Sequence, residues 1–104
     1  IVNPLSKNAR GKTLLDYADI IKEVCGYYYI PVLDLTRESG LNACIDYARY
    51  VEDNTAEIAY KVESNTISGT TYTYFTHLNE LGDKILARRI AGWLIQLTHE
   101  IEGI

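Results

Sequence analysis

Apolar side chains recur at helical spacing after residue 13, with charged positions between them that would face water. The apolar stripe consists of Leu14, Tyr17, Ala18, Ile21, Cys25 and Tyr28. Thr13 precedes the stripe, and Asp16 lies three residues after Thr13. This spacing is the pattern of a capping box at a helix N-terminus. The pattern therefore predicts an amphipathic helix over about residues 14–25, ended by Gly26.

A continuous apolar run follows this helix and surrounds Pro31. Its apolar side chains are Ile30, Val32, Leu33 and Leu35. A run without polar alternation is typical of a strand buried on both faces of a parallel sheet. Residues 1–5 resemble the end of a similar strand, stopped by Pro4. Because a strand, a helix and a strand in this order form a βαβ unit with a right-handed crossover, the pattern predicts an α/β fold with parallel strands.

Residues 36–73 carry the weakest pattern. Weak helical spacing runs through Ile45, Ala48, Val51, Ile58 and Val62. The Thr- and Tyr-rich stretch that follows, "SNTISGTTYTY", favours a short extended piece or a hairpin. We interpret residues from about 44 to 73 as an irregular insertion over the edge of the sheet.

The strongest helical pattern lies near the C-terminal end. Asn79 is a good N-cap residue, and the apolar spacing after it predicts a helix over about residues 80–97. The apolar face of this helix consists of Leu86, Ile90, Trp93, Leu94 and Leu97. We expect this face, like that of the first helix, to cover the sheet.

Composition and charge exclude several classes of protein. The 104 residues suffice for one small domain, and 10 basic against 14 acidic residues give a net charge of −4. No basic stripe is visible, so a nucleic-acid partner is not expected. No run of eighteen apolar residues and no signal-peptide pattern occur, so no membrane span is expected and the localisation stays open. Because the chain opens on an apolar "IV" without Met, we expect a processed or truncated product.

Two histidines, two cysteines and the tyrosines are the candidates for chemistry. His77, His99, Cys25 and Cys44 do not have zinc-ligand spacings, so we expect no metal and no cofactor. Cys25 is predicted to be a buried helix residue. Tyrosines could line a carbohydrate-binding surface, although packing is their commoner use. They are Tyr27, Tyr28, Tyr29, Tyr47, Tyr50 and Tyr60.

His77 lies two residues before the predicted N-cap of the last helix. The positive end of the helix dipole disfavours an imidazolium, so a histidine there would stay neutral near pH 7 and could act as a base. No acidic residue is its neighbour in sequence. The sequence around His77 therefore does not supply the acid that a catalytic histidine needs.

Three stretches in one order resemble the SGNH/GDSL hydrolases, a family of ester-cleaving enzymes. They are the strand ending in "NPL", the stretch "YADIIKEVCGYYYIPVLDLTRESGLN" and the helix "THLNELGDKILARRIAGWL". The resemblance covers the chain apart from about residues 44–73 and corresponds to the C-terminal half of the family domain. It implies a flavodoxin-like α/β/α sandwich.

The resemblance also implies roles for individual residues. In the family a serine attacks the ester, a histidine takes its proton, and an aspartate three residues before the histidine orients the imidazole. His77 takes the place of that base, and Asn79 and Gly82 match the positions after it. The position of the aspartate is occupied by Tyr74, which is neutral at pH 7. Asp34, at the end of the second predicted strand, could supply the missing acid, although a structural role for it is commoner.

The nucleophile block of the family is absent from this chain. No serine lies in a Gly-Asp-Ser or Gly-x-Ser-x-Gly setting. One hypothesis is therefore the C-terminal portion of an SGNH-type esterase or acylhydrolase, acting on acyl or O-acetyl esters that include acetylated glycans. The alternative is a non-catalytic SGNH-like structural or binding module of a surface or virion protein. In either case the N-terminal half of the domain, or a second copy of the chain, is the expected partner.

Overall fold

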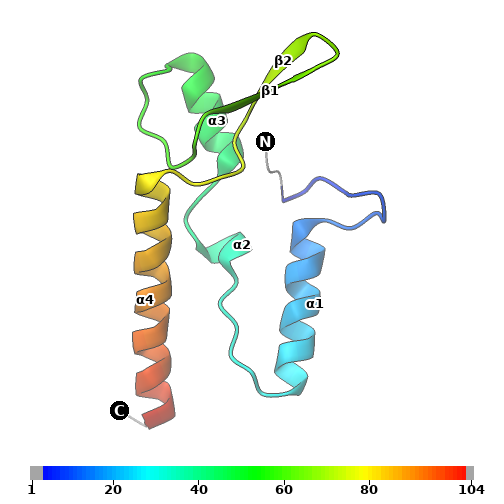
Figure 1. Ribbon diagram of the computed structural model, residues 1–104. Coiled ribbons are helices and arrows are strands. Elements are labelled where there is room, and N and C mark those ends of the chain that lie inside the picture. The colour runs from blue at the N-terminus through cyan, green and yellow to red at the C-terminus, as the bar shows by residue number, and fades with distance from the viewer. Residues whose placement is uncertain (1–3, 103–104) are drawn as a thin grey trace. The chain divides into compact units, whose positions relative to one another are not determined.

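The computed structural model describes residues 4–102, which form four helices and one two-stranded hairpin (Figure 1). The elements in chain order are α1 (Leu14–Tyr27), α2 (Leu35–Glu38), α3 (Ala43–Glu52), β1 (Glu63–Ile67), β2 (Thr70–Tyr74) and α4 (Glu80–Glu102). The described residues divide into two compact units. One comprises residues 41–86, and the other comprises residues 4–40 together with 87–102, so α4 contributes to both.

Helix α1 begins as predicted and ends two residues later than predicted. The Asp16 backbone N–H donates to Thr13 Oγ1 at 3.1 Å, and the Thr13 N–H donates to the Asp16 carboxylate at 2.9 Å, which confirms the capping box. Gly26 does not end the helix. The left-handed residue is Tyr29, with a φ of 57°, and the N–H of Ile30 donates to the carbonyl of Cys25. This is the Schellman ending, with a tyrosine where glycine is usual.

The strand predicted over residues 30–35 is wrong. Residues 30–34 are irregular, and α2 begins at Leu35 because the Asp34 side chain accepts a hydrogen bond from the N–H of Arg37 at 3.2 Å. Pro31 has no N–H to give to a neighbouring strand. Of the other predicted strand, residues 1–3 lie outside the described part, and Pro4 and Leu5 lie in a turn. The parallel α/β sheet therefore stays a prediction.

The stretch that was predicted as an irregular insertion contains α3 and the hairpin of β1 and β2. The strands pair antiparallel from Glu63 opposite Tyr74 to Ile67 opposite Thr70. Ser68 and Gly69 connect them with φ angles of 52° and 80°, as a two-residue type I′ turn requires. The hairpin is thus the alternative that the structure adopts for the Thr- and Tyr-rich stretch.

Phe75 is the centre of the apolar core in the unit of residues 41–86. Its side chain is fully buried. The ring centroids of Tyr47 and Tyr50 lie 5.5 and 5.6 Å from it in edge-to-face geometry, and the ring of Tyr60 is stacked at 6.3 Å. These tyrosines therefore serve packing. The buried aliphatic side chains of this unit are small, namely Ala43 and Ala59.

The unit of residues 4–40 and 87–102 leaves its helices more exposed. No residue of α1 is buried, and Ile21 on the predicted core-facing stripe is 54% exposed. Cys25 is half-buried and therefore less buried than predicted. It forms no disulfide. Helix α4 begins at the predicted residue and runs five residues beyond the predicted end. Trp93 is half-buried beside a cavity of about 230 Å³ that Leu33 and Glu38 also line.

Candidate functional site

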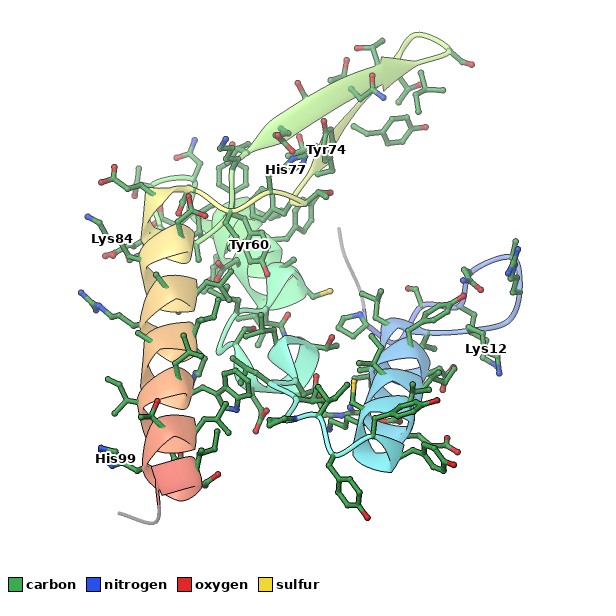
Figure 2. All side chains as sticks on the ribbon, turned by 60° about the horizontal axis from the view of Figure 1, so that its bottom comes forward. Lys12, Tyr60, Tyr74, His77, Lys84 and His99 are labelled. Atoms are coloured by element: carbon green, nitrogen blue, oxygen red, sulfur yellow. The ribbon has the colours of Figure 1, made fainter. Side chains whose placement is uncertain are left out.

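His77 lies in the short connection between β2 and α4, below the base of the hairpin (Figure 2). Its carbonyl accepts a hydrogen bond from the backbone N–H of Lys61 at 2.8 Å. The next residue, Leu78, forms an isolated antiparallel bridge with Tyr60. Two residues before His77, Phe75 is buried in the core. The backbone that carries the imidazole is therefore held on both sides.

Asn79 holds the start of α4 against residues 58–61. Its side-chain amide donates to the carbonyl of Ile58 at 2.7 Å, and its backbone N–H donates to the carbonyl of Ala59 at 3.0 Å. Its side-chain oxygen accepts from the N–H of Gly82 at 3.0 Å, which confirms Asn79 as the N-cap. The side chain of Asn79 thus both caps α4 and holds residues 58–61 against the start of the helix.

Gly82 is required by close packing in the first turn of α4. A Cβ atom at this position would collide with the carbonyl oxygen of Ala59 and would lie 3.0 Å from the side chain of Leu78. Gly82 is itself buried. The Asn-x-x-Gly spacing after His77 therefore has a structural cause, because the asparagine anchors residues 58–61 and the glycine lets them approach the helix.

Glu63 is the acid that accompanies His77. The Nδ1 atom of His77 lies 2.9 and 3.0 Å from the two carboxylate oxygens of Glu63. The Glu63 side chain is 25% exposed, whereas that of His77 is 66% exposed. A carboxylate can only accept a hydrogen bond, so Nδ1–H is the donor in this contact, and the tautomer that this contact favours leaves a lone pair on Nε2. The pair can therefore orient a base and balance the positive charge that the imidazole gains when it takes a proton.

Tyr74 does not act as the acid, yet its position explains how the acid reaches His77. Tyr74 lies directly opposite Glu63 in the strand register, and opposite residues project to the same face of a sheet. The carboxylate therefore comes from the partner strand, opposite Tyr74. Sequence reasoning missed Glu63 because it lies fourteen residues before His77. The turn at Ser68 and Gly69 was the available signal, since a two-residue turn sets the register.

Asp34 belongs to the other unit, and its charge is used there. Its side chain is 2% exposed and lies 2.8 Å from Lys22 Nζ and 2.7 Å from the Arg37 guanidinium. Hydrogen bonds from Lys22 and then from Arg37 lower the pKa of Asp34 to about 2. The structural role of Asp34, the commoner of the two considered from the sequence, is therefore the one that its contacts support.

The Asp34 ion pairs predict an acid-sensitive unit. A folded-state pKa below the ordinary value of 3.8 gives stability that is present above that value and lost as the pH falls toward 2. We expect Asp34→Asn to lower the free energy of unfolding by up to about 2 kcal/mol at pH 7 and by almost nothing near pH 2. Urea unfolding at several pH values, followed by Trp93 fluorescence, measures this difference.

The matched control for this prediction is Asp19→Asn. Asp19 pairs with the same arginine at 3.0 Å, but its side chain is 61% exposed. An exposed ion pair contributes little, so this variant should unfold like the parent at every pH. An Asp34→Asn variant whose deficit is the same at pH 7 and pH 2 would contradict the assignment.

The other histidine and the two cysteines form no metal site in the described part of the chain. His99 lies near the C-terminal end of α4, where a cation is favoured (Figure 2). No group of three or more His, Cys, Asp or Glu residues able to hold a metal occurs among residues 4–102. Within the same residues, no helix has the length and apolar character needed to cross a bilayer.

Comparisons with known proteins give no family for this chain. No protein-family model, no curated protein and no solved structure matches it. The His77–Glu63 pair and the anchored connection that carries it are therefore the features from which a function can be inferred.

Proposed function

We propose that this chain is the C-terminal portion of an SGNH-type hydrolase that cleaves acyl or O-acetyl esters, in which His77 is the general base and Glu63 the carboxylate that orients it. The observation that carries the proposal is the contact of 2.9 Å between His77 Nδ1 and the Glu63 carboxylate. A histidine held in this way has its Nε2 atom available for a proton. The flavodoxin-like fold belongs to the same proposal.

The chemistry assigned to the pair is that of the base and acid in a serine hydrolase. Nε2 of His77 accepts the proton of a serine hydroxyl as the serine oxygen attacks the ester carbonyl. Glu63 then balances the charge of the imidazolium. The imidazolium returns the proton to the departing alcohol, which leaves an acyl-enzyme, and water hydrolyses the acyl-enzyme by the same route.

The nucleophile in this proposal comes from a segment outside the chain. Oxyanion donors would come from the same segment, since the sequence lacks the blocks that carry them in the family. The role of Asn79 and Gly82 is structural, because they hold the connection of His77 against residues 58–61. The substrate class is an acyl or O-acetyl ester, including acetylated glycans.

The test is hydrolysis of a short-chain acetyl ester by the parent protein that includes the upstream segment. We expect His77→Ala to abolish hydrolysis, and His99→Ala, which removes the other histidine of the chain, to leave it unchanged. The 104-residue chain alone should not exceed the background rate. Activity of the parent that survives His77→Ala would defeat the proposal.

A second candidate function is a non-catalytic SGNH-like module that serves assembly or binding in a surface or virion protein. The observation that favours it is the exposed apolar surface of α1, where Ile20, Ile21 and Val24 are 45 to 54% exposed. The sequence upstream in the parent gene separates the two candidates. A strand followed by Gly-Asp-Ser supports the enzyme, and its absence supports the module.

A further inference from the structure

The outer edge of β2 carries none of the features that usually prevent strands from pairing between molecules. One edge of β2 pairs with β1, and no further strand pairs with it among residues 4–102. Residues 64–76 contain no charged residue and no proline. The strand register is continuous from the Glu63–Tyr74 pair to the Ile67–Thr70 pair, so no β-bulge bends the edge away. Native proteins protect exposed edges with charges, prolines or bulges.

The turn fixes which backbone groups lie on this edge. In a type I′ hairpin the residues that flank the turn, here Ile67 and Thr70, form a hydrogen-bonded pair, and such pairs alternate along the strands. The backbone groups of Thr70 and Tyr72 therefore point toward β1. Those of Thr71 and Thr73 point outward, and both residues are exposed.

We propose that β2 pairs antiparallel with β2 of a second copy of this chain, about a twofold axis that passes beside Tyr72. In this register Thr71 of each copy exchanges backbone hydrogen bonds with Thr73 of the other. A twofold interface requires reciprocal contacts, and here Thr71 of each copy pairs with Thr73 of the other. Tyr72, which is 54% exposed, then faces Tyr72 of the second copy in a close, non-hydrogen-bonded pair.

A second copy is the occupant that charge and composition favour. Each copy has a net charge of −4, yet residues 64–76 are uncharged, so two copies can approach along β2 with little repulsion. Thr and Tyr are good strand formers, whereas β1 contains Asn65, a residue type that is depleted in strands. Pairing would convert an isolated two-stranded hairpin, which is marginally stable, into a four-stranded sheet. The inference does not depend on the proposed hydrolase function.

Sedimentation of the 104-residue chain over a range of concentrations tests the interface. We expect a monomer–dimer equilibrium, and we expect Thr71→Pro to raise its dissociation constant at least about tenfold, because proline removes an outward N–H. Thr66→Pro is the matched control. The hydroxyl groups of Thr66 and Thr71 lie 3.0 Å apart, so both variants lose the same contact, but only Thr71 lies on the proposed interface. Thr66→Pro should leave the dissociation constant unchanged.

A crosslink tests the register without a proline. With Cys25 and Cys44 changed to serine, Tyr72→Cys should form a disulfide between copies under a mild oxidant, since facing residues of a close pair are within disulfide reach. Asn65→Cys, opposite Tyr72 on β1, should not. A chain that stays monomeric at all concentrations would overturn the proposal. So would equal weakening by Thr66→Pro and Thr71→Pro, or a dimer that Thr71→Pro leaves intact.

Discussion

If the proposed hydrolase function holds, Glu63→Gln is expected to lower the turnover of the parent protein by about 10³- to 10⁴-fold, as the loss of the acid does in a serine protease triad. Glutamine has nearly the same shape and can still accept the hydrogen bond from His77 Nδ1. It is neutral, however, and cannot balance the charge of the imidazolium. Because Glu63 acts through His77, the loss should appear in kcat, with KM little changed. Steady-state kinetics on a short-chain acetyl ester measure both.

Two further variants show whether the acid is Glu63 or another residue. Tyr74→Asp places a carboxylate where the resemblance to SGNH hydrolases implies one, but it lies opposite Glu63, so we expect no gain in turnover. Glu57→Gln changes an exposed glutamate of the same unit and should have no effect. A rise with Tyr74→Asp would show that the acid position is vacant in the parent. A loss with Asp34→Asn but not with Glu63→Gln would assign the role to Asp34.

The tautomer of His77 gives a readout that needs no nucleophile. A neutral imidazole whose Nδ1–H donates to Glu63 should carry its proton on Nδ1, and ¹⁵N NMR of the two histidines distinguishes the tautomers. His99 serves as the internal reference. In the isolated chain, replacement of Glu63 by alanine should lower the fraction of His77 that carries its proton on Nδ1. A His77 ring that shows the same tautomer in both proteins would contradict the pairing.

The starts of α1 and α4 could be predicted from the sequence because each depends on residues a few positions apart. Thr13 and Asp16 form a reciprocal cap, and Asn79 binds the N–H of Gly82, so the first turn of α1 and of α4 is encoded locally. The helix ends were predicted less well. The residue that takes the left-handed conformation after α1 is Tyr29, and its type gives no signal of this.

The failures share a dependence on residues distant in sequence. An apolar run such as residues 30–35 becomes a strand only if another strand pairs with it, whereas the cap from Asp34 gives a local alternative, α2. The acid beside His77 was sought in the motif, but the hairpin register brings it from β1. A motif defined by spacing along the chain cannot identify a side chain that strand pairing brings close from a distant part of the sequence.

Phe75→Ala is expected to lower the free energy of unfolding of the unit of residues 41–86 by about 3–5 kcal/mol. The side chain is fully buried among Tyr47, Tyr50 and Tyr60, and the buried aliphatic side chains of this unit are alanines. Little apolar surface is thus available to fill the cavity. A loss of this size is a large part of the stability of a small domain, so the variant should be mostly unfolded in this unit.

Tyrosine near-UV circular dichroism during urea unfolding measures this loss, since Trp93, the single tryptophan, belongs to the other unit and reports on it separately. The His77–Glu63 contact should weaken with the core, because Phe75 lies two residues before His77 and Tyr60 is bridged to Leu78. Phe75→Leu keeps most of the volume and should cost less, about 1 kcal/mol. Val51→Ala, at an exposed apolar position of α3, should change stability by no more than about 0.5 kcal/mol. If Phe75→Ala lowers the free energy of unfolding by less than about 1 kcal/mol, the packing of the tyrosines does not depend on Phe75. The connection that carries His77 would then be held by the hydrogen bonds of Asn79 and Lys61 without the core.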